Sequence, residues 1–127
     1  MNDYTRIAGV IGYLEEHSAE VYPHLEAMAK LVAEGVAAEA KMAGVPLTLN
    51  RVGAMWTWFF TGGPVRNYED AAKSDTAAFG KFHRAMLDRG VWLPPSQFEA
   101  MFLGWTHADA EVEATVAAAR EAFAELK

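Results

Sequence analysis

The apolar positions change period several times along the chain, which predicts a mixture of helices and strands. Apolar residues three and four apart predict a first helix that stops near the polar cluster at residues 15–18. Its inner face is predicted to hold Tyr4, Ile7, Ile11 and Leu14. A second helix is expected from near Pro23 to Gly44, since proline favours a first helical turn and glycine the residue after the last one. Its stripe is Leu25, Met28, Val32 and Val36.

Residues 47–61 have the pattern of extended chain, with Gly53 as a bulge or turn between a short strand and a longer one. One face of this segment is predicted to hold Val52, Ala54, Trp56, Trp58 and Phe60. The other face is apolar too, through Met55 and Phe59, and a strand that is apolar on both faces is normally covered on both. A turn at residues 62–64 ends the strand, and a polar loop follows.

Two further helices are expected in the second half of the chain. The first begins at a cap near Ser74 or Asp75 and ends at Gly90. Its inner stripe is predicted to be Phe79, Phe82, His83 and Met86. Short extended pieces at residues 91–93 and 101–104 flank a loop, and a capping box at residues 106–109 starts the last helix. That helix is expected to turn inward Val112, Val116, Ala119 and Phe123.

The order of these elements predicts an α+β fold, in which a small, mostly antiparallel sheet is backed by helices. The chain has 127 residues, a length that fits a single domain of residues 1–127. Seventeen acidic against eleven basic residues give a net charge of -6, which argues against a nucleic-acid partner.

The absence of cysteine excludes disulfides, thiolate zinc sites and cysteine nucleophiles. No segment has the length and apolarity of a signal peptide or a membrane helix, so we expect a cytoplasmic protein without a membrane partner. The four histidines lack the paired spacing of metal ligands, so no metal site is expected. They are His17, His24, His83 and His107. The serines lack the glycine-flanked turn of a nucleophile elbow, and no glycine-rich phosphate loop follows a strand.

Glu99 has the most unusual setting of any residue, because it is a lone carboxylate in the apolar and aromatic run from residue 91 to 105. A buried carboxylate is costly unless a charged or hydrogen-bonding group meets it, so Glu99 is a candidate for contact with a ligand or partner. The alternative is a solvated side chain in a loop, which is usual for an acid in an irregular segment. The local sequence leaves both interpretations open.

Several runs of residues, taken in order, carry a resemblance to a known family. The first run covers residues 45–61. The following loop contributes Val65, Asn67, Tyr68, Glu69, Asp70, Ala71, Lys73, Ser74 and Asp75, and the next helix end contributes Met86, Leu87, Arg89 and Gly90. The last matches are residues 95–100, Phe102 and His107. From about Leu14 to the C-terminus, the chain resembles the small C-terminal domain of glutamate-1-semialdehyde 2,1-aminomutase. It departs from the family pattern at Pro94, Met101 and Trp105, so we expect the loop that carries Glu99 to be repacked.

The resemblance implies a fold like that of the C-terminal domain of fold-type I transferases that use pyridoxal phosphate (PLP). It also implies an isomerase related to class III aminotransferases, which converts glutamate-1-semialdehyde to 5-aminolevulinate for tetrapyrrole biosynthesis. Glu99 is then the one catalytic residue expected here, with Ser96 and Gln97 shaping the substrate loop. Related aminotransferases commonly place an arginine near the Glu99 position to hold a substrate carboxylate. A glutamate there would repel a second carboxylate and favour amino groups.

The large domain that holds the cofactor in that family has no counterpart in this chain. The lysines are predicted to lie on helices, near helix starts or at the chain end, and none matches the family's cofactor lysine. They are Lys30, Lys41, Lys73, Lys81 and Lys127. A PLP enzyme needs a positioned lysine, a phosphate cup and a partner for the ring nitrogen. We therefore expect no cofactor site in this chain alone and no activity without a large domain. The chain is then either a fragment or a separately encoded remnant.

Two other functions stay open. The chain is a non-catalytic assembly module if the surface around Trp56, Trp58 and Trp105 forms a dimer, another homo-oligomer or a partner interface. It is a subunit of a split enzyme if a PLP-binding chain completes it in trans.

Overall fold

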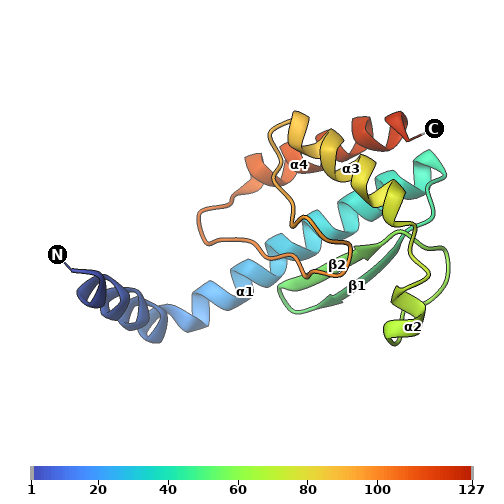
Figure 1. Cartoon of the computed structure of the whole chain (residues 1–127). Helices are drawn as coiled ribbons and strands as arrows, with labels where there is room; N and C mark the ends of the chain where they lie inside the picture. Colours follow the sequence, from blue (N-terminus) through green and yellow to red (C-terminus); the bar gives the residue numbers. More distant parts are fainter. Residues whose placement is uncertain (1, 127) are drawn as a thin grey trace.

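A computed structural model of the chain describes residues 2–126, so Lys127 lies outside the described residues. The elements are α1 (Asp3–Ala43), β1 (Thr48–Val52), β2 (Met55–Phe59), α2 (Tyr68–Ala71), α3 (Thr76–Asp88) and α4 (Asp109–Glu125). In Figure 1, α1 runs diagonally through the molecule, with the β1–β2 hairpin on one side and α3 and α4 on the other. The predicted fold class, a small antiparallel sheet backed by helices, is confirmed.

The prediction of two separate helices before the hairpin is wrong, because α1 continues without a break from Asp3 to Ala43. Polar residues such as those at 15–18 do not end a helix when they are exposed, and no glycine cap follows them. Pro23 lies inside α1, where its ring displaces the carbonyl one turn earlier and bends the helix. Figure 1 shows α1 changing direction in its blue, N-terminal part.

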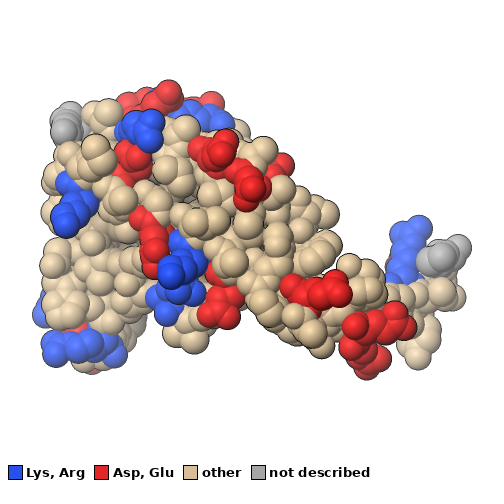
Figure 2. Space-filling model, turned by 180° about the vertical axis from the view of Figure 1, so that it is seen from behind, with Lys and Arg blue, Asp and Glu red and all other residues tan. Residues whose placement is uncertain are grey.

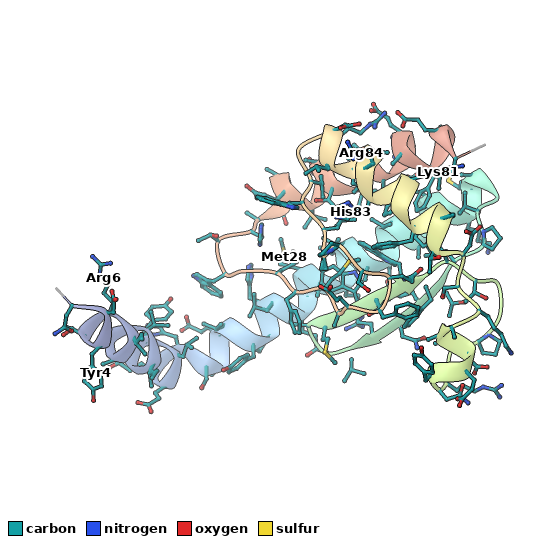
Figure 3. The ribbon with its side chains drawn as sticks, viewed as in Figure 1. Tyr4, Arg6, Met28, Lys81, His83 and Arg84 are labelled. Atoms are coloured by element: carbon teal, nitrogen blue, oxygen red, sulfur yellow. The ribbon has the colours of Figure 1, made fainter. Side chains whose placement is uncertain are left out.

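The first part of α1, residues 3–20, forms an arm that projects from the rest of the molecule (Figures 1 and 2). Its large apolar side chains are exposed, from 42% for Tyr13 to 83% for Tyr4, and the first buried residue of α1 is Val21. In Figure 3, Tyr4 and Arg6 extend from the arm in opposite directions. A helix that is apolar on several sides normally has a partner that covers it.

The predicted hairpin is confirmed: β1 and β2 pair antiparallel, with Val52 opposite Met55 beside the turn. Gly53 occupies this turn at a φ of 58°, a conformation that glycine adopts at little cost. Val52 does not share the inner face as predicted; it is 74% exposed, because the turn separates it from the alternation of β2. The inner face of β2 holds Trp56 and Trp58 and is continued by Phe60. On the other face Met55 is exposed and Phe59 is half-buried, so the described residues supply only part of the expected cover.

Stacked and edge-to-face aromatic rings join the hairpin to the helices. Phe82 of α3 stacks on Phe123 of α4 with ring centroids 4.6 Å apart. Trp58 meets Phe82 edge to face, and its indole N–H donates to the carbonyl of Ala33 in α1 at 3.0 Å. Three helices and β2 therefore meet in one core.

The predicted ends of α3 and the start of α4 are largely confirmed. Asp75 caps α3 by accepting a hydrogen bond from the backbone N–H of Ala78, and Gly90 follows the helix at a φ of 81°. At α4, the carboxylate of Glu111 accepts from the backbone N–H of Ala108 at 2.8 Å, which is one half of a capping box. The other half is missing because the cap residue is Ala108, whose side chain cannot accept a hydrogen bond.

Two predictions about shorter segments are wrong. The loop before α3 contains α2, which begins where Asn67 accepts a hydrogen bond from the N–H of Asp70. Lys73 lies in the turn between α2 and α3, near the start of α3 as predicted. Residues 91–93 and 101–104 form no strands, and only Met101 pairs with the hairpin. Among the described helices, none combines the length and apolarity that crossing a membrane requires.

A substitution at Gly35 of α1 tests the close contact between α1 and α4. A Cβ at this position would lie 2.8 Å from Cγ2 of Val116, a stiff β-branched side chain. We expect Gly35→Ala to lower the free energy of unfolding by about 1 kcal/mol, because overpacking costs roughly 1–3 kcal/mol and the gain in helix propensity is about 1 kcal/mol. Urea denaturation measures the change.

The matched control is Gly80→Ala in α3, where an added Cβ meets nothing within 4 Å. We expect this variant to gain about 0.5–1 kcal/mol. A gain of the same size for Gly35→Ala would contradict the described packing.

Candidate functional site

Residues 94–101, which we call the site loop, lie along the edge of β2 that faces away from β1. Trp56 of β2 pairs with Arg51 of β1 on one side and with Met101 on the other. The N–H of Trp56 donates to the carbonyl of Met101 at 3.2 Å, and the N–H of Met101 donates back at 2.7 Å. The site loop thus takes the position of a third strand without being one, and it covers a sheet edge that would otherwise stay open.

Gln97 holds the other end of the site loop through its side chain. Its amide Nε2 donates to the carbonyl of Trp58 at 2.8 Å, and its Oε1 accepts from the backbone N–H of Phe60 at 2.9 Å. A side-chain amide presents the same donor and acceptor as a peptide group, so Gln97 pairs with the strand edge as a backbone would. The side chain is buried, and both of its hydrogen bonds are internal.

Glu99 lies between these two anchors. Its carbonyl accepts from the hydroxyl of Thr57 at 3.1 Å, and its N–H donates to the carbonyl of Ser96 at 3.3 Å. The hydroxyl of Ser96 accepts from the N–H of Phe98 at 3.1 Å, which closes a tight turn. The backbone of Glu99 is therefore fixed, while the residue itself is exposed.

Two exposed aromatic residues lie next to this turn. Tyr68 of α2 and Phe98 of the site loop have ring centroids 6.4 Å apart. Behind them, Asp70 accepts a hydrogen bond from the backbone N–H of Arg66 and pairs with the side chains of Arg66 and Lys73. The backbone N–H of Arg66, followed by its guanidinium and the ammonium of Lys73, holds the pKa of Asp70 below its usual value against the opposing effect of burial.

The segment that leads into the site loop is tied to α3. His83 lies on α3 beneath this segment (Figure 3), and its Nε2 is 3.0 Å from the carbonyl of Leu93. Because a carbonyl oxygen only accepts, Nε2 carries the proton in this pair. His83 is half-buried, so its place in the predicted inner stripe of α3 is explained by this hydrogen bond.

The three residues predicted for the site are thus brought together in one loop, with different roles. Gln97 is a buried anchor, Ser96 forms the turn, and Glu99 is the exposed carboxylate that the turn presents. Thr57 and Tyr68 also lie at the site and were not predicted as site residues. A threonine in the middle of an aromatic strand is the signal that could have identified Thr57.

The comparison with known proteins gives close relatives. No family model matches the chain. Over 117 residues, or 92% of the chain, it is 58% identical to the glutamate-1-semialdehyde 2,1-aminomutase of Acidobacterium capsulatum, covering 27% of that protein. It is 53% identical to that of Myxococcus xanthus over 83% of the chain and 24% of the relative. The chain is a homologue of part of glutamate-1-semialdehyde 2,1-aminomutase. It spans about a quarter of the length of the relatives that it matches, and the resemblance predicted from its sequence is confirmed.

Solved structures show the same fold. An omega-transaminase from Sphaerobacter thermophilus superposes with a TM-score of 0.79 at 23% identity, over 89% of this chain and 26% of that one. A glutamate-1-semialdehyde aminomutase from Pseudomonas aeruginosa PAO1 gives 0.74 at 24% identity, over 85% and 24%. The latter enzyme has also been solved in complex with PMP. The predicted likeness to a domain of these transferases is confirmed at the level of the fold.

Gln97→Leu tests the anchor of the site loop. Leucine keeps much of the volume but leaves the N–H of Phe60 and the carbonyl of Trp58 without partners. A buried polar group without a partner costs about 1–3 kcal/mol, so we expect a loss of about that size in the free energy of unfolding. Urea denaturation measures the loss. Ser96→Ala is the control in the same loop, with an expected change within about 0.5 kcal/mol, and equal losses would contradict the assigned roles.

Asp70→Asn tests the pH dependence that its lowered pKa implies. The pKa of Asp70 is lower in the folded than in the unfolded chain, so its ionised form stabilises the fold above the unfolded pKa of about 3.9. That stability is lost as the pH falls through the folded pKa. We expect Asp70→Asn to melt below the unmodified chain at pH 7, with a smaller difference at pH 3. Thermal melts at both pH values measure this, with the exposed Glu113→Gln as control; a difference that grows on acidification would contradict it.

Proposed function

We propose that the chain is the small C-terminal domain of a glutamate-1-semialdehyde 2,1-aminomutase, a single domain of residues 1–127. In this proposal it supports the PLP-dependent conversion of glutamate-1-semialdehyde to 5-aminolevulinate only together with a PLP-binding large domain. The observation that carries the proposal is the identity of 58% over 92% of the chain, to a relative of which only 27% is covered. A cytoplasmic location and assembly as a dimer belong to the same proposal.

The residues of the site loop do not fit PLP by themselves. The loop contains no lysine, and its polar groups are a carboxylate, a hydroxyl and an amide, of which the amide is already bound to β2. A carboxylate also repels a phosphate group. Among the described lysines, Lys73 pairs with Asp70, and the others lie exposed on α1 and α3. The proposal therefore assigns the cofactor to the large domain.

Exposed aromatic side chains support a surface that contacts another domain. Trp92 is 86% exposed and Phe102 is 67% exposed, and Phe98 lies between them in sequence with half of its surface exposed. Large aromatic side chains exposed on one segment in this way favour an interface. The predicted interface around Trp56 and Trp58 is wrong, since both are buried in the core. Of the three tryptophans named for it, only Trp105 is exposed.

We assign Glu99 the role of selecting the substrate. Its carboxylate is exposed on a loop whose backbone is fixed on both sides by hydrogen bonds to β2. A fixed negative charge opposes a second carboxylate in the substrate and favours an amino group. Ser96 and Gln97 shape the loop that presents this charge.

The exposed arm of α1 favours a second candidate, an assembly role in which the arm pairs with another polypeptide. In Figure 2, carboxylates lie along the arm near the body of the molecule and a basic residue lies near its tip. The partner is then a second copy of the chain or a separate PLP-binding chain that completes a split enzyme. Purification with such a chain would favour the split enzyme, and a stable homo-oligomer would favour the module.

A chimera tests the proposal, with this chain in place of the matching segment of the Acidobacterium capsulatum enzyme. We expect the chimera to form 5-aminolevulinate, measured by a colorimetric assay. Glu99→Arg in the chimera should lower this rate by about tenfold and raise transamination of a dicarboxylic amino acid, because the charge that opposes a second carboxylate is reversed. Glu113→Arg makes the same charge change at an exposed position of α4 and should leave both rates unchanged.

Borohydride treatment of the chain alone with equimolar PLP is the companion experiment. We expect scattered, substoichiometric labelling of exposed lysines or none, read by intact mass and peptide mapping. One stoichiometric adduct at a single lysine would overturn the assignment of the cofactor to a large domain. An inactive chimera that is folded and binds PLP would overturn the proposed family function.

A further inference from the structure

A cavity of about 680 Å³ lies between β2, the first half of α4 and the chain on both sides of the site loop. Its volume lies within the range of small-molecule sites, roughly 300–1,000 Å³. The apolar side chains that line it come from α1, β2, α4 and the loop segments: Val32, Trp56, Trp58, Leu93, Met101, Leu103 and Val112. Neither Ser96, Gln97 nor Glu99 is among its lining residues.

Two buried tryptophans of β2 line this cavity, and only one of them has its polar atom satisfied. The indole N–H of Trp58 donates to the carbonyl of Ala33. The indole N–H of Trp56, on the same face of β2 with its ring centroid 5.6 Å away, has no hydrogen-bond partner among the described residues. Trp56 is 3% exposed, and a buried donor without a partner costs about 1–3 kcal/mol. An acceptor that enters the cavity would recover this cost.

The charges around the cavity exclude an anion as the natural occupant. Arg89 lines it, but its guanidinium is bound to the carboxylates of Glu121 and Glu125 and to the carbonyl of Ala85. The other charged side chain is that of Glu111, whose pKa is lowered chiefly by the hydrogen bond from the N–H of Ala108. A carboxylate or phosphate would therefore meet a negative charge and no free positive one. A cation is disfavoured as well, because it cannot accept a hydrogen bond from the unpartnered N–H of Trp56.

The mouth of the cavity offers a second donor. His107 lines it, and the Nδ1 of His107 accepts a hydrogen bond from the N–H of Gly104 at 2.8 Å. The neutral imidazole therefore carries its proton on Nε2, where it can donate. The side chains of Trp92 and Phe102 also line the cavity and are exposed, so the entrance is aromatic.

We propose that this cavity binds an uncharged, largely apolar molecule with one hydrogen-bond-accepting oxygen, such as an aromatic ketone, and that the indole N–H of Trp56 donates to that oxygen. The N–H is covered in the structure. Met101 lines the same cavity, and a flexible thioether side chain can shift to expose it. The inference goes beyond the proposed aminomutase function and concerns the chain without a large domain, because Trp92 and Phe102 at this entrance are the side chains assigned above to contact with another domain.

The test compares acetophenone with ethylbenzene, which has the same ring and a similar shape but no acceptor. The chain has four tryptophans, so its labelled indole N–H resonances are few and can be assigned by substitution. We expect saturable binding of acetophenone that shifts the Trp56 resonance downfield. Ethylbenzene should bind more weakly and leave that resonance in place.

Two variants separate the hydrogen bond from the shape of the cavity. Trp56→Phe should weaken the binding of acetophenone by about three- to tenfold relative to that of ethylbenzene, because it removes the donor and keeps an aromatic ring. Ala114→Phe places a ring in the cavity from an exposed position of α4 and should abolish binding of both. Glu113→Phe, one residue earlier and outside the lining, is its control.

Equal affinities for the two probes, or an unmoved Trp56 resonance with acetophenone bound, would overturn the proposal. So would the absence of saturable binding in a folded chain. A Trp56 N–H found bonded to water and not to acetophenone at saturation would also overturn it, because water alone would then satisfy this donor.

Discussion

The outer edge of β2 is the constraint on which this structure depends. A hairpin of two strands leaves an edge of unpaired N–H and carbonyl groups, and here that edge is met by Met101, by the side chain of Gln97 and by the N–H of Asp75. The same contacts bring the start of α3 and the site loop against the inner aromatic face of the hairpin. The hydrogen bonds that satisfy this edge therefore also close the core. They hold the irregular site loop in place as strand pairing holds a strand.

Helix α1 has two different environments along its length. From Val21 onward it is the element that the hairpin and α4 both contact, and its small residues allow close packing against α4. Before Val21 it has no contact partner of comparable extent, and its apolar side chains remain exposed. The buried part of the helix supplies the energy that keeps the exposed part helical, since an isolated segment of that length is marginal in water. The arm is apolar and exposed, in a chain that spans about a quarter of the length of its relatives.

The sequence predicted the hairpin, α3, α4 and the stripe that α4 buries, because glycine, aspartate caps and a period of 3.6 residues act locally. It failed where tertiary contacts decide. Pro23 is a helix-start signal by propensity, but it lies inside α1, between the exposed arm that precedes it and the packed residues that follow it. Extended pieces around residues 91 and 101 are predicted from apolar content, whereas only Met101 pairs with β2 through its backbone and Gln97 pairs through its side chain. Glu99 is exposed because it lies between these two anchors, Gln97 and Met101.

Because Gln97 replaces a peptide group with a side chain, the distance between the two anchors of the site loop is set by β2 and not by the loop's own conformation. The three residues between Gln97 and Met101 then behave as a short span between fixed supports. An inserted residue in this span would bulge outward without moving either support, whereas an insertion within β2 would shift one support relative to the other. Evolution can therefore change the length and chemistry of the span around Glu99 independently of the core, which makes it a place where specificity can diverge while the fold stays constant.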